Sequence, residues 1–191
     1  MRAVGFLIVM LFAVGCAKKT SVTDPFFEID QLIDEQIKTL KDTGASVDKR
    51  AEVGDAKDAS IFVPDSAQWA NELDAFRQIS SINKPIYKEA YRIEDGLDDN
   101  RSNLKIRRFS TERNIPVKIL DVYYQDNIEK LRKIEAVITD QNALFFASKK
   151  LTLQFEEHQE KLSLSSYTIQ GVQKMMLRDS VNFIIESKVN Y

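Results

Sequence analysis

The feature that most constrains the fold is a change of hydrophobic period near Asn103. Beyond it, apolar residues recur at every second position, which is typical of strands with one buried face. Six such runs follow one another, separated by turn-like breaks at 111–114, 126–129, 140–142, 158–161 and 178–180. Breaks this short permit antiparallel neighbours but not parallel crossovers. This part of the chain therefore predicts an up-and-down antiparallel sheet of about six strands.

The preceding part of the chain shows helical spacing instead. Asp24 and Pro25 suit the start of a helix, and apolar residues then recur three or four positions apart as far as Leu40. We expect a helix over about 24–42. A second helix is predicted from Pro64 onward, with one apolar face formed by Trp69, Leu73, Phe76 and Ile79.

The segments around these helices give weaker patterns. Residues 46–63 predict a β-hairpin that turns near Gly54, with a loose loop as the alternative. Asn83-Lys84-Pro85 should end the second helix, and 86–91 has room for one more helical turn. Residues 96–100 suggest a solvent loop. The predicted fold class is α+β, with N-terminal helices packed on a mostly antiparallel sheet that curves into a half-barrel.

The N-terminus has the layout of a secretory signal peptide. Arg2 precedes a short apolar run, and the uncharged stretch from Ala3 to Ala17 spans 15 residues. A permanent membrane span needs about 20 residues, so this stretch is short for one. Small residues then precede Cys16, the single cysteine of the chain.

Ala13-Val14-Gly15-Cys16 resembles the lipobox of bacterial lipoproteins. In that family the signal is cut before the cysteine, whose thiol is diacylated and whose new amino group is usually acylated as well. The resemblance implies a signal peptide over 1–15, an acylated tether over 16–23 and one α+β domain over 24–191. Because Ala17 replaces the Asp that favours inner-membrane retention, it also implies an outer-membrane location in the bacterial cell envelope. A plain signal peptide with an incidental cysteine is the alternative.

A second resemblance covers most of the mature chain. Trp69, Glu72, Leu73 and Phe76, the triplet Asn83-Lys84-Pro85 and a late Tyr167-x-Ile169-x-Gly171-x-Gln173-Lys174 look like a group of uncharacterised lipoproteins from Bacteroidota. That group brings no functional assignment with it. The expected fold also resembles, in topology alone, the half-barrel of the lipoprotein carriers of the Gram-negative envelope.

Composition narrows the classes of function. With 27 Lys plus Arg, 29 Asp plus Glu and a formal net charge of -2, the chain lacks the basic excess typical of a nucleic-acid binder. One cysteine excludes an intrachain disulfide, and one histidine, His158, is the only imidazole for catalysis or metal binding. His158 lies among polar residues, which indicates a solvated turn more than a metal site. We therefore expect no metal and no cofactor.

No catalytic constellation is visible in the sequence. Ser163, Ser165 and Ser166 lie in a strand pattern without a Gly-x-Ser-x-Gly nucleophile motif, so they are better explained as polar-face residues. The acidic segment Glu94–Asp99 lacks the spacing of an EF-hand, and a solvated loop is favoured over a weak Ca²⁺ site. We expect the protein not to be an enzyme.

Two groups of residues are candidates for binding. Lys105, Arg107 and Arg108 place positive charge on one strand and would form an anion-binding patch, although the polar face of an ordinary sheet is the favoured explanation. Leu144, Phe145 and Phe146 would contact a ligand or a membrane if exposed, although strand core is the commoner fate of phenylalanine.

The leading functional hypothesis is an outer-membrane lipoprotein, anchored through Cys16, with a non-enzymatic binding or structural role. Its partners would be the membrane, through the N-terminal lipid, and either an envelope protein or an amphipathic ligand. The alternative is a lipid or lipoprotein carrier with an apolar cavity in the curved sheet. An unfilled apolar concave face would favour the carrier, and a filled one would count against it.

Overall fold

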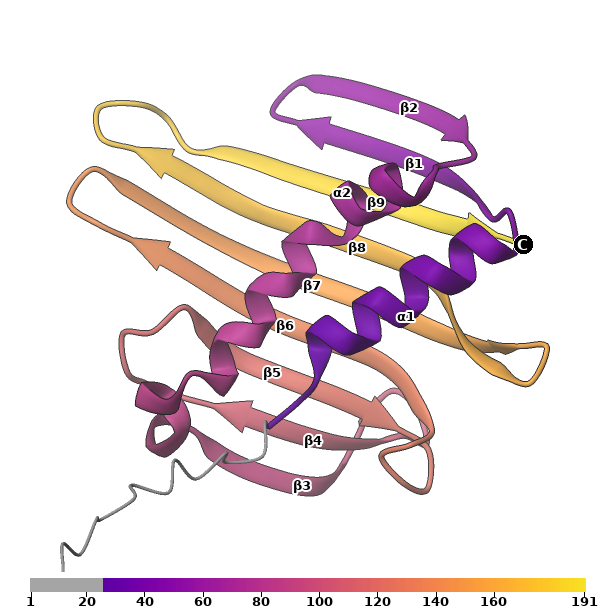
Figure 1. Ribbon diagram of the computed structural model, residues 1–191. Coiled ribbons are helices and arrows are strands. Elements are labelled where there is room, and N and C mark those ends of the chain that lie inside the picture. The colour runs from indigo at the N-terminus through magenta and orange to yellow at the C-terminus, as the bar shows by residue number, and fades with distance from the viewer. Residues whose placement is uncertain (1–25) are drawn as a thin grey trace, which may run out of the picture.

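The computed structural model describes residues 26–191, and one sheet of nine antiparallel strands dominates it (Figure 1). The strands are β1 (Ser46–Val53), β2 (Ala56–Phe62), β3 (Arg92–Asp98), β4 (Lys105–Ser110), β5 (Val117–Tyr124), β6 (Leu131–Gln141), β7 (Phe145–His158), β8 (Lys161–Met175) and β9 (Val181–Asn190). Their order across the sheet is β2-β1-β9-β8-β7-β6-β5-β4-β3. The helices are α1 (Ile29–Asp42) and α2 (Ser66–Arg77), followed by the 3₁₀ helices η1 (Gln78–Asn83) and η2 (Pro85–Ala90).

The six strands predicted from the alternating pattern are confirmed as β4 to β9, each paired antiparallel with the next. The total of about six is wrong, because the sheet has nine strands. The hairpin over 46–63 is confirmed, and its first strand lies beside β9 and extends the sheet. The helices are therefore not grouped ahead of the sheet, since β1 and β2 lie between them in the chain.

The interpretation of 96–100 as a solvent loop is wrong for its first part. Residues 92–98 form the edge strand β3, which pairs with β4. Its register shifts between Glu94 and Leu97, and Gly96 has a φ of 75°. A bulge of this kind interrupts the alternation of side chains, so the sequence shows no period of two there.

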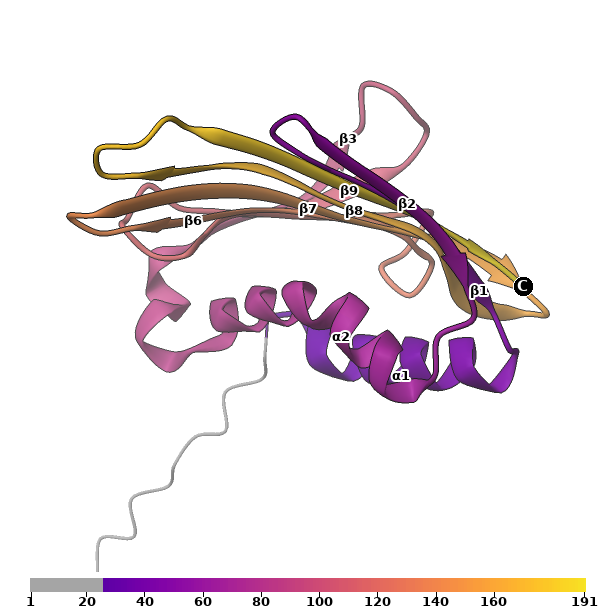
Figure 2. The same cartoon turned by 90° about the horizontal axis from the view of Figure 1, so that it is seen from above.

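The sheet is curved and open, and the helices cover its concave face (Figure 2). The apolar faces of α1 and α2 are buried against it, as the sequence predicted for Trp69, Leu73 and Phe76. Side chains with less than two percent exposure come from both layers: Ile29, Ile33, Leu40, Trp69, Leu73, Phe76, Leu120, Ile134, Leu151 and Tyr167. The concave face is therefore filled by helix side chains where α1 and α2 lie on it.

Polar contacts fix the helices to the sheet. Glu72 of α2 accepts hydrogen bonds from Lys49 Nζ at 2.8 Å and from the Tyr167 hydroxyl at 2.7 Å. Burial, first of all, raises the pKa of that hydroxyl, with the Glu72 carboxylate adding to the rise. Asp65 caps α2 by accepting from the backbone N–H of Gln68, whose side chain bonds back to Asp65 N.

Side-chain contacts also fix the start of the described chain to the rest of the fold. The Asn83 side chain accepts from Phe26 N and donates to Phe27 O, both at 2.8 Å. The Phe26 ring stacks on Phe109 with centroids 5.7 Å apart. Within residues 26–191, no helix has the length and apolar character needed to cross a bilayer.

Candidate functional site

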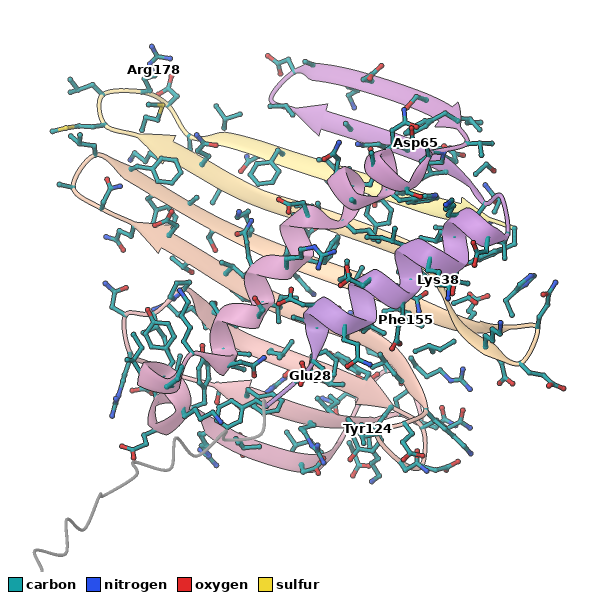
Figure 3. The ribbon with its side chains drawn as sticks, viewed as in Figure 1. Glu28, Lys38, Asp65, Tyr124, Phe155 and Arg178 are labelled. Carbon is teal, nitrogen blue, oxygen red and sulfur yellow. The ribbon has the colours of Figure 1, made fainter. Side chains whose placement is uncertain are left out.

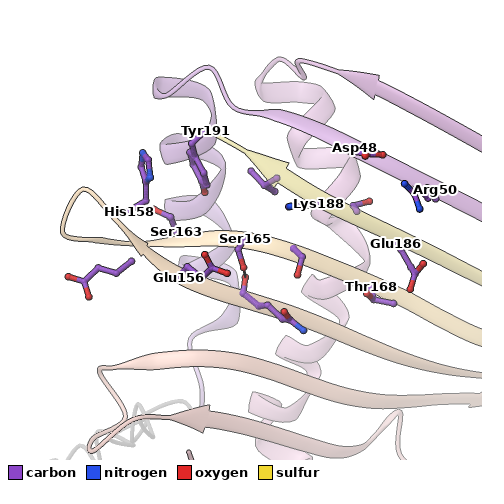
Figure 4. Close-up of a pocket in the computed structure, with 15 residues that line it drawn as sticks. Asp48, Arg50, Glu156, His158, Ser163, Ser165, Thr168, Glu186, Lys188 and Tyr191 are labelled. Carbon is purple, nitrogen blue, oxygen red and sulfur yellow. Dashed lines mark hydrogen bonds between the residues drawn. The ribbon is translucent and has the colours of Figure 1, made fainter. Parts of the chain in front are cut away.

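A polar cleft of about 560 Å³ lies on the sheet face opposite the helices (Figure 4). It spans β1, β9, β8 and β7, close to the turn that joins β7 to β8. Charged and hydroxyl-bearing side chains dominate its lining: Asp48, Arg50, Gln154, Glu156, Glu157, His158, Ser163, Ser165, Ser166, Thr168, Glu186, Lys188 and Tyr191.

Strand register places opposite charges side by side in this cleft. Asp48 of β1 lies directly across from Lys188 of β9, and Arg50 lies across from Glu186. Thr168 of β8 continues the second of these rows. Side chains at such positions have Cβ atoms about 4.5–5.5 Å apart, which suits mutual attraction. The cleft therefore presents donors and acceptors of both charges, which suits a polar ligand or a polar protein surface.

A β-bulge shapes the cleft. The β7–β8 register shifts after Gln154, which pairs with Ser166, so that Ser165 is left as an extra residue. Its hydroxyl donates to Gln154 O at 3.2 Å. Bulges bend a strand locally and re-aim its side chains. Residues on both strands at the bulge, such as Gln154 and Ser166, line the cleft.

Side chains from both faces of the sheet hydrogen-bond to the backbone at the bulge. From the helix side, the buried Gln36 of α1 accepts from Leu164 N at 2.8 Å and donates to Leu162 O at 3.1 Å. From the cleft side, the Tyr191 hydroxyl donates to Leu164 O at 2.9 Å. Buried backbone groups need such partners, so these side chains stabilise the irregular strand.

The aromatic wall of the cleft is a stacked pair. The rings of His158 and Tyr191 have centroids 4.6 Å apart and an interplanar angle of 18°. Burial chiefly raises the pKa of the Tyr191 hydroxyl, and Glu156 adds to the rise. The hydroxyl therefore stays protonated at neutral pH and holds its bond to the backbone. His158 forms the last pair of the hairpin with Lys161, beside the turn that the sequence indicated, and its ring stacks on Tyr191.

A second hollow, of about 490 Å³, lies along the same strands. Lys150, Gln170, Ile184 and Glu52 line it, and register places them in one row across β7, β8, β9 and β1. This row is the next one after Arg50, Glu186 and Thr168 along the strands. The recessed part of this sheet face thus extends toward the opposite strand ends and becomes less charged.

The structure keeps Lys105 and Arg107 on one face of β4 but separates Arg108 from them. Arg107 and Arg108 are neighbours on β4, so alternation directs them to opposite faces of the sheet. Each base has a carboxylate partner: Lys105 with Asp98, Arg107 with Asp95 and Arg108 with Asp121. The hydrogen bond from Arg107 is the main cause that lowers the pKa of Asp95. Paired charges of this kind support an anion patch poorly.

The acidic residues of Glu94–Asp99 form local ion pairs and hydrogen bonds with their neighbours. Asp99 accepts a hydrogen bond from the Ser102 hydroxyl at 2.6 Å, which is the main cause of its lowered pKa. Asp95 also accepts from the Tyr124 hydroxyl at 2.8 Å. Within the described part of the chain, no three His, Cys, Asp or Glu side chains converge as a metal site would require.

The predicted apolar cluster lies at the other end of the long strands. Leu144 is 64% exposed and Phe146 is 36% exposed, while Phe145 is half-buried. The favoured interpretation of this cluster as strand core is therefore wrong for Leu144 and Phe146. The turn from β6 to β7, where this cluster lies, extends beyond the part of the sheet that α1 and α2 cover (Figures 1 and 2). Cys16, the predicted lipid attachment site, lies outside the described residues.

Sequence reasoning missed the cleft because its residues come from four strands that are distant in the chain. Ser163, Ser165 and Ser166 were recognised as polar-face residues, and the structure gathers them with His158 at one cleft. The pairing of β1 with β9, which completes the cleft, has no signal in the sequence. Two polar pairs flank the β7–β8 turn, Glu156-Glu157 and Ser165-Ser166, and they are the sequence signal that points to this surface.

Comparison with known proteins returns no match. No family model matches the chain, and neither a curated protein nor a solved structure does. Function is therefore inferred from the geometry of residues 26–191 together with the N-terminal sequence.

Proposed function

We propose that the protein is a lipid-anchored lipoprotein of the bacterial envelope whose domain has a non-enzymatic binding role. The polar cleft over β1, β9, β8 and β7 is the observation that carries the binding role. The lipobox resemblance at Ala13–Cys16 supports the anchor, and Ala17 supports the outer membrane. Two or more acyl chains would give stable attachment.

The chemistry of the cleft indicates what it binds. Four carboxylates and two bases line the cleft, and opposite charges alternate between neighbouring strands, as Arg50 and Glu186 do. A polar surface or molecule that carries groups of both signs would complement them. The stacked His158 and Tyr191 rings add an apolar surface at one wall. An envelope protein or an amphipathic molecule fits this combination.

The anchor is tested in cells with Cys16→Ser. We expect the substitution to abolish membrane association, and mass spectrometry of the native protein should show diacylglycerol on its new N-terminal cysteine. The control is Ser46→Ala, a hydroxyl change in β1 that leaves the N-terminus intact. Membrane association that persists in Cys16→Ser, without any lipid on the protein, would contradict the anchor.

The cleft is tested by exchanging a charge pair. Arg50→Glu combined with Glu186→Arg keeps opposite charges across β1 and β9 but reverses their order, so stability should change little. Photo-crosslinking from Thr168 in the native envelope should capture a partner with the natural pair and lose it with the exchanged pair. A capture that is equal in both would argue against recognition by these charges.

The carrier hypothesis makes a different prediction. A carrier needs an apolar cavity, and on the concave face that space is occupied by side chains such as Trp69 and Phe76. Native mass spectrometry of the chain from Ala17 onward, followed by organic extraction, separates the two hypotheses. A lipid-like molecule at near-stoichiometric amount would favour the carrier, and a mass without ligand would favour the binding role.

A further inference from the structure

One end of the sheet carries an uncommon number of exposed apolar side chains. At the turns that join β6 to β7 and β8 to β9, six large apolar residues are at least about a third exposed: Leu144 (64%), Phe146 (36%), Met175 (47%), Met176 (59%), Leu177 (97%) and Val181 (42%). We call this group the apolar tip. Soluble proteins rarely expose apolar residues in a contiguous group without using them.

Strand pairing makes the apolar tip contiguous. Phe145 of β7 pairs with Met175 of β8, and Met176 N donates to Leu144 O at 2.8 Å, so the two turns are hydrogen-bonded side by side. Val181 follows on β9, where its neighbour across the ladder is Gln173 of β8. Both turns project beyond the helix layer (Figure 2).

The conformation of the β8–β9 turn places its apolar side chain outward. Leu177 has a φ of 64°, in the left-handed region that a branched side chain adopts at a cost, and it is almost fully exposed. A glycine or an asparagine would meet the backbone requirement with less strain. The turn thus holds a leucine in solvent where local structure alone would favour another residue.

We propose that the apolar tip inserts into the surface of a lipid bilayer and orients the anchored domain on it. This inference rests on the proposed lipid anchor, because Cys16 lies ten residues before Phe26 (26 − 16 = 10). At no more than about 3.6 Å per residue, that tether keeps Phe26, where the described domain begins, within about 36 Å of the membrane. A bilayer is thus an apolar phase held close to the anchored domain.

Shape and charge also favour a bilayer over a second protein. The tip is a pair of projecting turns and not a groove, and a protrusion enters a deformable phase without needing a matched pocket. Lys174 and Arg178 flank it, and Figure 3 shows Arg178 at the outer limit of the β8–β9 turn. Long basic side chains beside inserted apolar residues reach the phosphate groups of lipids. The nearby Asp140 and Asp179 balance their charge, so insertion should depend on apolar burial more than on attraction to anionic lipid.

The test uses the chain from Ala17 onward, which lacks Cys16 but retains every helix and strand of the described fold. Because it then contains no cysteine, Leu177→Cys gives a single position for an environment-sensitive fluorophore. Vesicles of phosphatidylethanolamine and phosphatidylglycerol should shift its emission to the blue, and this shift should survive raised salt. The same label at Ile61→Cys, which is on β2 and 73% exposed in the natural chain, should not respond.

An unlabelled pair of variants measures the contribution of the side chain. Leu177→Asn fits the left-handed backbone and should lower the vesicle partition coefficient by about tenfold, because burying one leucine is worth at least the 1.4 kcal/mol that a factor of ten represents. Leu177→Met should retain partition. Failure of the Leu177→Cys label to respond, an equal response at both labels, or equal partition of the two unlabelled variants would overturn the proposal.

These outcomes are separate from the test of the anchor. A negative vesicle result with Cys16-dependent membrane association would leave the lipoprotein proposal intact and remove only the insertion. A positive vesicle result together with Cys16-independent association would assign membrane binding to the tip alone.

Discussion

The strands β7 and β8 pass through two different environments. In their middle, Leu151, Leu153 and Tyr167 are covered by the helices and are at most one percent exposed. At their free end, Phe146 and Met175 belong to the same two strands but reach solvent. At the free end apolar residues are consecutive, so alternation places Met175 on the face of Tyr167 but Phe146 on the opposite face. On the face that Tyr167 and Met175 share, burial is therefore decided by whether a helix lies opposite the strand.

This difference separates two uses of apolar residues in one sheet. Under the helices, each side chain contributes hydrophobic free energy to folding, at about 25 cal/mol per Å² of buried apolar area. At the apolar tip little area is buried, so the side chains contribute little to stability. Their presence there is better explained by contact with something outside the chain.

Replacing a phenylalanine by alanine should have the largest difference in effect between the two regions. Phe76 is fully buried and packs edge-on against Tyr167 at 6.0 Å, so Phe76→Ala should lower the free energy of unfolding by about 3–5 kcal/mol. Phe146→Ala should cost about 1 kcal/mol or less. Urea denaturation of both variants measures the two values. Similar losses would show that the tip is part of the core.

Alkaline pH should act on buried tyrosines, and the apolar tip contains no tyrosine. Burial is the first cause that raises the pKa of Tyr91 to about 12, from an ordinary value of 10.0, and its hydroxyl donates to Val117 O. Folding thus favours the protonated form. Stability from this group is complete below pH 10 and declines as the pH rises toward 12, by about 3 kcal/mol in all at about 1.4 kcal/mol per pKa unit. Tyr167 and Tyr123, whose pKa values are also raised, add to the decline.

Urea midpoints measured between pH 9 and pH 12 would follow this loss. Tyr91→Phe removes the titrating hydroxyl and keeps the ring, so it should be less stable at neutral pH but decline less steeply above pH 10. An unchanged slope in Tyr91→Phe would mean that other groups cause the alkaline transition.

How far the sequence predicts the fold depends on how regular each segment is. The period of two located all six strands from β4 to β9, because side chains alternate strictly where the ladder is unbroken. It missed β3, where Gly96 and the register shift interrupt the alternation. It also gave no sign that β1 pairs with β9, since a hairpin does not specify which sheet edge it joins.

The candidate sites were harder to predict than the strands. Alternation alone should have separated Arg107 from Arg108, so that error was avoidable. The exposure of Phe146 could be predicted in the same way, because alternation along β7 places it on the opposite face from Leu151. The cleft was hidden, because the bulge at Ser165 and the opposition of Arg50 to Glu186 arise only when distant strands pair.

The smallest expected effect is the most informative about the apolar tip. Leu177→Gly removes the strain of a leucine in the left-handed region, which costs about 1–2 kcal/mol. The glycine also gives the unfolded chain more conformational freedom, which lowers the free energy of unfolding by about 0.5–1 kcal/mol. The variant should therefore be slightly more stable than the natural chain, by up to about 1 kcal/mol in urea denaturation. The matched change Leu73→Gly, in the middle of α2, should be strongly destabilising. Greater stability in Leu177→Gly would show that the fold does not need this leucine, as the proposed insertion requires, whereas a clear loss of stability would show that the leucine belongs to the fold.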